Sequence, residues 1–135
     1  MADRPTPSEQ ELEVLKVLWD EGPSTVRGVD EVLRSRGVRR IYTHWQTLLN
    51  RLQAKGHVAS EARPAPLGHL FRAVSTRDDL LRARLQDLAD ELCEGATAPL
   101  VLTLVEGRAF SDADLARLRA VLDTHRPRLG SRTED

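Results

Sequence analysis

The chain has 135 residues and a formal net charge of −1, with 40% hydrophobic and 30% charged residues. This length favours one domain, or a small domain with an appendage, and the composition is typical of a soluble globular protein. The sequence contains no run of 18 apolar residues and does not open with a signal-peptide pattern. We therefore expect a cytoplasmic protein without a membrane partner. The single cysteine, Cys93, excludes an intramolecular disulfide and a multi-cysteine metal site, and a small core residue is favoured over a redox sensor.

Positive charge is concentrated in residues 34–72, although the whole chain is slightly acidic. This segment holds eight basic residues against one acidic residue, Glu61, which gives it a local charge of +7. Local charge sets the field that a phosphate backbone meets, so the segment indicates a nucleic-acid partner. The alternative is an ordinary solvated face. The basic residues are Arg34, Arg36, Arg39, Arg40, Arg51, Lys55, Arg63 and Arg72.

A short lead-in and two helices are predicted in the first 35 residues. Residues 1–7 are polar, contain two prolines and are predicted to be a flexible lead-in. A capping box of Ser8 and Glu11 starts a helix at about Glu9, and Gly22-Pro23 ends it. Residues 24–26 suit either a minimal strand or the cap of a second helix, which runs to about residue 35.

A third helix, at about residues 42–55, has two different faces. At about 100° per residue, an apolar stripe of Trp45, Leu48, Leu49 and Leu52 lies on one side. The opposite side gathers uncharged donor and acceptor side chains, which suit the reading of base edges. Only residues 38–40 separate it from the second helix, as a helix-turn-helix requires. This predicts a DNA recognition helix with a polar face of Thr43, Gln46, Thr47 and Asn50, flanked by Arg51.

Two short strands are predicted after the third helix. Residues 57–63 and 69–74 show weak alternation, and the Pro- and Gly-containing residues 64–68 form a turn between them. A hairpin after a helix-turn-helix is the arrangement of a winged helix. Because an isolated hairpin is marginal in water, it must pack on the helices or lie on DNA.

Three further helices are predicted in the C-terminal half. A capping box of Thr76 and Asp79 opens a helix of about 18 residues that Gly95 ends. Residues 99–105 are apolar nearly all round, so this helix must be buried. Ser111 and Asp114 cap the last helix, whose Leu115, Leu118, Val121 and Leu122 are expected to point inward. Residues 126–135 are predicted to be disordered.

These helices carry more aliphatic surface than one chain can cover, which favours a two-fold dimer over packing back onto the winged helix. The predicted fold class is therefore mainly α with a small β-hairpin wing. A winged helix-turn-helix at 8–75 precedes a helical dimerisation region at 76–125. The expected dimer residues are Leu81, Leu85, Leu88, Leu92, Leu100, Leu104, Leu118 and Leu122.

The chain resembles the penicillinase repressor family, the BlaI/MecI/CopY type. The resemblance is carried by residues 12–19 (LEVLKVLW), 22–27 (GPSTVR), Tyr42-Thr43, residues 47–52 (TLLNRL) and Lys55-Gly56. It covers residues 8–75 by motif and the remainder by helix layout. The resemblance implies a homodimeric repressor that binds double-stranded DNA at a palindromic operator, with the third helix in the major groove.

The resemblance also implies roles for single residues. Thr43, Gln46, Thr47 and Asn50 would face bases or nearby phosphates. Tyr42 would contact DNA at the helix start, and Arg51 would touch the backbone or brace the helix. Arg63 and Arg72 would place the wing on phosphates. Arg39 and Arg40, from the charge pattern, are expected to strengthen binding to any sequence.

The sequence departs from the family pattern at several points. His44-Trp45 replaces Thr-Val, so Trp45 demands more core volume and His44 adds a donor that alters operator preference. The wing keeps Phe71 but has Ala73 in place of a second aromatic residue. The C-terminal region lacks a cysteine-rich tail, which disfavours a copper sensor, and lacks an Asn-Phe pair around 96–110. Release by a sensor protease and release by a small-molecule inducer therefore both stay open.

Enzymatic and metal-binding functions are disfavoured. No histidine has helical i, i+4 spacing to another histidine or to Cys93, and a ligand pair of His57 and His69 on neighbouring strands is a weak alternative. Known catalytic motifs are missing, so we expect no catalytic residue, no metal and no cofactor. Trp19 is expected in the core. Two other functions stay open: a ligand-responsive regulator with a pocket lined by residues 99–105, and a winged helix used only for protein interaction.

Overall fold

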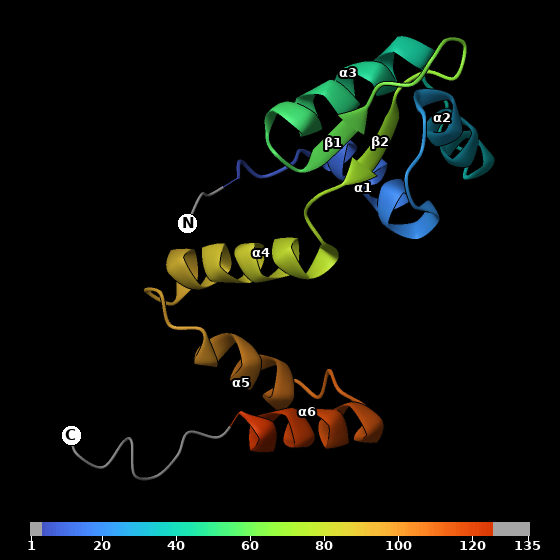
Figure 1. Cartoon of the computed structure of the whole chain (residues 1–135). Coiled ribbons are helices and arrows are strands. Elements are labelled where there is room, and N and C mark those ends of the chain that lie inside the picture. Colours follow the sequence, from blue (N-terminus) through green and yellow to red (C-terminus); the bar gives the residue numbers. More distant parts are fainter. Residues whose placement is uncertain (1–3, 126–135) are drawn as a thin grey trace. The chain divides into compact units, whose positions relative to one another are not determined.

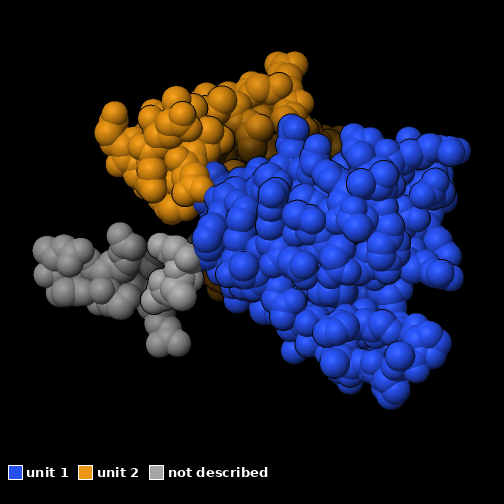
Figure 2. Space-filling view, turned by 90° about the horizontal axis from the view of Figure 1, so that it is seen from above, with its two compact units in different colours: residues 1–84 blue, residues 85–135 orange. Residues whose placement is uncertain are grey.

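The computed structural model describes residues 4–125, which form six helices and one two-stranded hairpin (Figure 1). The chain divides into two compact units, residues 1–84 and 85–135 (Figure 2), and each is described by itself. In chain order the elements are α1 (Glu9–Glu21), α2 (Val26–Ser35), α3 (Tyr42–Ala54), β1 (Val58–Glu61), β2 (Leu70–Ala73), α4 (Arg77–Leu92), α5 (Ala98–Glu106) and α6 (Asp112–Thr124).

Helix α1 begins and ends where the sequence predicts. The Glu11 backbone N–H donates to Ser8 Oγ (3.1 Å), and the Ser8 N–H donates to Glu11 Oε1 (3.0 Å), which completes the capping box. Gly22 ends the helix at φ 85°, a left-handed conformation that glycine adopts without a steric penalty.

Residues 24–26 fulfil both of the roles that the sequence left open. Ser24 exchanges backbone hydrogen bonds of 2.9 and 2.8 Å with Phe71, so a one-residue bridge extends the hairpin. The next residue, Thr25, caps α2, because its Oγ1 accepts from the Gly28 N–H at 3.0 Å. This junction ties the start of α2 to the wing.

The core of the first unit is built on the apolar stripe of α3. Trp45, Leu48, Leu49 and Leu52 are all buried, and α3 packs against both α1 and α2. Strands β1 and β2 pair antiparallel from Val58↔Ala73 to Glu61↔Leu70. The other buried apolar residues are Val14, Leu15, Val17, Leu18, Val26, Val29, Leu33, Val58 and Phe71. This is the predicted winged helix-turn-helix, and the mainly helical fold class with a hairpin wing is confirmed.

A buried ion pair joins α1 to the end of α3. Glu11 is only 2% exposed, and Lys55 Nζ donates to its Oε1 at 2.6 Å. Lys55 also donates to the Thr6 carbonyl (3.3 Å), and buried His57 contacts the Pro5 carbonyl at 2.7 Å through Nε2. Residues 5–7, which lie in the expected flexible lead-in, are therefore held against the rest of the first unit, a contact that no sequence pattern indicates.

Helix α4 crosses the boundary between the units. Its capping box forms as expected, with Thr76 and Asp79 exchanging hydrogen bonds of 2.9 and 3.0 Å. The helix has 16 residues rather than about 18, because it ends at Leu92, three residues before Gly95. Cys93, which follows it, is partly buried.

The expected burial of α5 and α6 is not met within one chain. None of the described residues of these two helices is buried. Leu115, Val121 and Leu122 are exposed instead of pointing inward, and Leu118 is only half-buried. The apolar surface is present as predicted, but the second unit offers too little apolar surface to cover it. The predicted tail at 126–135 lies outside the described residues.

The buried ion pair predicts a pH-dependent loss of stability in Glu11→Gln. Burial alone would raise the pKa of Glu11, but hydrogen bonds from Lys55 and the Ser8 N–H lower it below the usual value. The stabilisation is therefore complete above the unfolded pKa and is lost as the pH falls through the folded pKa. Glu11→Gln should lower the free energy of unfolding by about 1–3 kcal/mol at pH 7, measured by urea titration.

The same substitution should matter less at a second, lower pH that lies below the folded-state pKa of Glu11, because the carboxyl is then protonated in the parent chain as well. Glu13→Gln, an exposed position on the same helix, is the matched control and should change little. An equal loss from Glu11→Gln at both pH values would contradict the role given to the ion pair.

Candidate nucleic-acid interface

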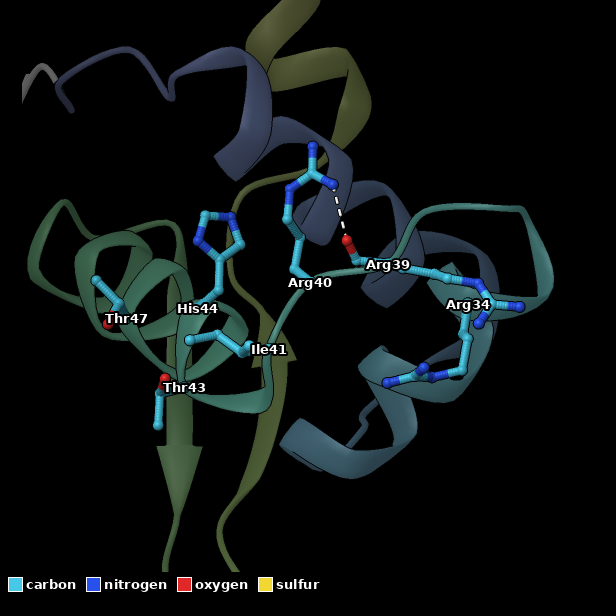
Figure 3. Close-up of a pocket in the computed structure, with 7 residues that line it drawn as sticks. All are labelled: Arg34, Arg39, Arg40, Ile41, Thr43, His44 and Thr47. Carbon is cyan, nitrogen blue, oxygen red and sulfur yellow. Dashed lines mark hydrogen bonds between the residues drawn. The ribbon is translucent and has the colours of Figure 1, made fainter.

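A concave, basic surface lies where α2 turns into α3. It encloses about 690 Å³. We call it the arginine basin; its lining residues are Arg34, Arg39, Arg40, Ile41, Thr43, His44 and Thr47 (Figure 3). Thr43 and Thr47 leave α3 on one side, and His44 leaves it beside the side chain of Arg40 (Figure 3). The structure thus brings together five of the residues predicted to bind DNA.

The arginine basin is positively charged. Among the described residues that line it, three are arginines and none is acidic. Arg34 is partly neutralised by Asp30, at 3.2 Å, whereas Arg40 Nη1 donates to the Arg39 carbonyl at 2.8 Å. Neither Arg39 nor Arg40 has a carboxylate partner among the residues that the structure describes. Such a concavity suits a phosphate group.

A hydrogen bond between two helices fixes the position of α3 beside this basin. Trp45 is buried, and its indole Nε1 donates to Asp30 Oδ1 on α2 at 2.9 Å. The His44 ring lies edge-on to the Trp45 ring, with centroids 5.1 Å apart. His44 Nε2 is buried and has no hydrogen-bond partner among the described residues. The bulky His44-Trp45 pair is therefore accommodated by a polar anchor on α2.

The outward face of α3 has the predicted polar character. Thr43, Thr47 and Asn50 are exposed, and Gln46 is half-buried. Gln46 Nε2 donates to Asn50 Oδ1 at 3.4 Å, a long bond that a better partner can replace. Between Arg34 and Glu61 the sequence has no acidic residue. This face can therefore approach a polyanion without charge repulsion.

A second hollow, the wing groove, joins α3 to the hairpin loop. It encloses about 560 Å³ and contains Tyr42 and Gln46 of α3 together with Arg27 of α2 and His69 of the wing. The loop between β1 and β2 lies beside the N-terminal part of α3 (Figure 1). The other residues that line the wing groove are Thr25, Val26, Pro66, Leu67, Gly68 and Phe71.

Sequence reasoning missed Arg27 and His69 as candidates for this surface. Arg27 is the last residue of the GPSTVR motif, so the family resemblance could have drawn attention to it. Its position near Tyr42 in the wing groove depends on tertiary packing. The sequence pattern indicates His69 only as a metal partner of His57. The two do not pair: His57 is buried against Ser75 Oγ at 2.9 Å, while His69 is exposed next to the Phe71 ring.

Like Asn50, the three remaining predicted contacts line neither hollow. Arg51 is exposed, and its charge helps to lower the pKa of Glu11, so it is close to α1. Arg63 donates to the carbonyls of Leu67 and Gly68 at 3.1 and 3.2 Å and thereby closes the wing loop. Arg72 is exposed and lines a separate hollow with Trp19. A phosphate contact by any of them stays a prediction.

Within residues 4–125, no group of three His, Cys, Asp or Glu side chains is placed to hold a metal ion. In the same part of the chain, no helix combines the length and apolar character that a membrane span needs.

Comparison with known proteins gives one family match. The profile described as "Penicillinase repressor" matches residues 7–124. No curated protein matches the chain. Among solved structures, a MarR family protein from Bacillus stearothermophilus is 17% identical, with a TM-score of 0.43 over 87% of this chain and 71% of that one. That likeness is too distant to bear on the function of this chain.

The bond between Trp45 and Asp30 predicts a difference between two substitutions. Asp30→Ala leaves the buried indole N–H without an acceptor and should lower the free energy of unfolding by about 1–3 kcal/mol. Asp30→Asn loses the charge facing Arg34 but keeps an acceptor, so it should cost less. Urea unfolding followed by tryptophan fluorescence measures both, and equal losses would show that the indole bond is not the stabilising contact.

Proposed function

Because the chain belongs to the penicillinase repressor family, whose members are DNA-binding transcriptional regulators rather than enzymes, we propose that it is a homodimeric repressor of a palindromic operator. In this proposal α3 enters the major groove, and its polar face reads base edges. Residues 8–75 bind DNA and residues 76–125 form the dimer. The half-sites lie about one or two helical turns apart.

The observation that carries the DNA-binding role is the acid-free polar face of α3 between two hollows that each hold basic side chains. Thr43, Thr47 and Asn50 are exposed on this face, where they are available to bases. Arg39 and Arg40 in the arginine basin, and Arg27 in the wing groove, lie on either side of α3 and suit the phosphates of a DNA backbone.

The observation that supports the dimer is the exposed apolar surface of α4, α5 and α6. Leu92 and Leu122 are 67% and 68% exposed, values that are costly for a leucine in water. Exposed leucines in this number indicate an interaction site. The other predicted dimer residues, Leu81, Leu85, Leu88 and Leu104, are also exposed, whereas Leu100 and Leu118 are half-buried.

DNA binding predicts two kinds of mutant. Arg39→Ala and Arg40→Ala should each weaken binding to every sequence and reduce the salt slope by about 1, because each removes one phosphate contact. Thr47→Ala should instead reduce the preference for the operator over unrelated DNA. Fluorescence anisotropy across a salt series, with DNA from upstream of the chain's own gene and a scrambled duplex, measures both effects.

Arg36→Ala is the matched control for the two arginines. Its guanidinium is already engaged by Asp20 at 3.4 Å, so its removal should change the salt slope less. The proposal fails if the parent chain shows no sequence-selective binding at moderate salt. No DNA affinity in the parent chain, together with tolerance of charge reversal at Arg39, Arg40 and Arg51, would favour a winged helix used only for protein interaction.

The dimer predicts that Leu88→Asp yields a monomer. Leu88 is 40% exposed on α4, so the substitution should disturb the interface and leave the first unit folded. Sedimentation equilibrium of the parent chain should give twice the chain mass, and the variant should give the chain mass. Leu67→Asp, an exposed leucine of the hairpin loop, is the control and should stay dimeric. A parent chain that is monomeric at all concentrations tested would refute the dimer.

A further inference from the structure

Another hollow on the first unit has a chemistry unlike that of the DNA-facing surfaces. It lies between α1 and the first two turns of α4 and encloses about 310 Å³. We call it the α1–α4 groove. Its apolar lining residues are Leu12, Trp19, Leu80 and Leu81, and its basic lining residues are Lys16, Arg77 and Arg84. All of them belong to the first unit.

The contacts around Trp19 hold the two helices of the groove together. Trp19 Nε1 donates to the Ser75 carbonyl at 2.8 Å, just before α4 begins. The Arg77 guanidinium lies 5.1 Å from the centroid of the Trp19 ring and 3.4 Å from Asp20. Leu80 packs against the core. The groove is therefore a preformed feature of the first unit.

The charges of the groove are only partly compensated. Asp20 faces Arg77, but neither Lys16 nor Arg84 has a hydrogen bond or ion pair to any residue that the structure describes. Among the described lining residues none is acidic. An apolar surface bearing uncompensated cations is complementary to a molecule that is both apolar and anionic.

We propose that the α1–α4 groove binds a small aromatic carboxylate. The aromatic ring packs on Trp19 and the leucines. The carboxylate accepts hydrogen bonds from the ammonium of Lys16 and the guanidinium of Arg84. A neutral aromatic molecule would leave both cations unpaired, and a nucleic acid would leave the leucines in water. The volume of about 310 Å³ suits a molecule of one or two rings.

This site has a consequence for regulation that rests on the proposed function. The first two turns of α4 line the groove, and the later turns carry Leu85, Leu88 and Leu92, which are proposed for the dimer together with Leu81 of the groove. A ligand that binds both α1 and α4 would favour one arrangement of that helix over others, and operator affinity would change by the ratio of its affinities for them. The groove would then be the site for a small-molecule inducer, and this site does not require the exposed helices α5 and α6.

The test uses 1-naphthoate and the full chain without DNA, so its result is independent of the proposed repressor function. The chain has two tryptophans, and ¹H–¹⁵N spectra resolve one indole N–H for each. Naphthoate should shift the Trp19 signal in a saturable manner and leave that of buried Trp45 unchanged. The neutral analogue 1-naphthalenemethanol should bind at least tenfold more weakly.

Substitutions of the two unpaired cations complete the test. Lys16→Ala and Arg84→Ala should each weaken naphthoate binding at least tenfold, and both positions are exposed, so folding is kept. Arg82→Ala, an exposed arginine of α4 outside the groove, is the matched control. The proposal is overturned if Trp19 gives no saturable shift, or if the neutral analogue binds equally well. It is also overturned if the Trp19 signal follows protein concentration instead of naphthoate, which would mean that a second copy occupies the groove.

Discussion

The hydrogen bond from Trp45 to Asp30 is the constraint on which the candidate interface depends. An indole is large enough to anchor a helix by burial, but its N–H needs an acceptor when water is removed. Asp30 supplies that acceptor from α2, at 2.9 Å. The bond fixes α3 against α2, and the short connection between them then holds Arg39 and Arg40 beside the first turn of α3. The arginine basin is thus a product of core packing.

The charge around α3 likewise depends on contacts made elsewhere in the first unit. The chain is nearly neutral overall, yet several acidic residues of the first unit are paired with cations outside the polar face of α3. Glu11 is buried against Lys55, and Asp20 is paired with Arg36 and Arg77. These pairs remove negative charge from the field around α3. A single net charge for the chain would have excluded a nucleic-acid partner, whereas the local balance explains how a slightly acidic protein can approach DNA.

Local signals account for most of what the sequence predicted correctly. Ser8, Thr76 and Ser111 each start a helix because a capping side chain acts within three residues of itself. The same reasoning could not find Arg27 and His69, since their approach to Tyr42 depends on how the wing folds over α2. Local patterns also do not indicate that Arg63 donates its hydrogen bonds to the carbonyls of the wing loop.

The predicted burial of α5 shows a different limit. Its apolar composition correctly indicates that the helix needs a partner surface, but a hydrophobic pattern does not say whether that surface lies in the same chain. In the described residues of one chain it is missing.

Helix α4 is the element that spans the boundary between the two units. It is held at its start by contacts with α1, and its later leucines are exposed. A helix is stiff along its length, because each turn is bonded to the next. In the proposal made above, a ligand that changes the contacts around Trp19 would act on the later turns of α4 through this stiffness. The α1–α4 groove lies at these contacts, which makes it a physically economical place for a signal to enter.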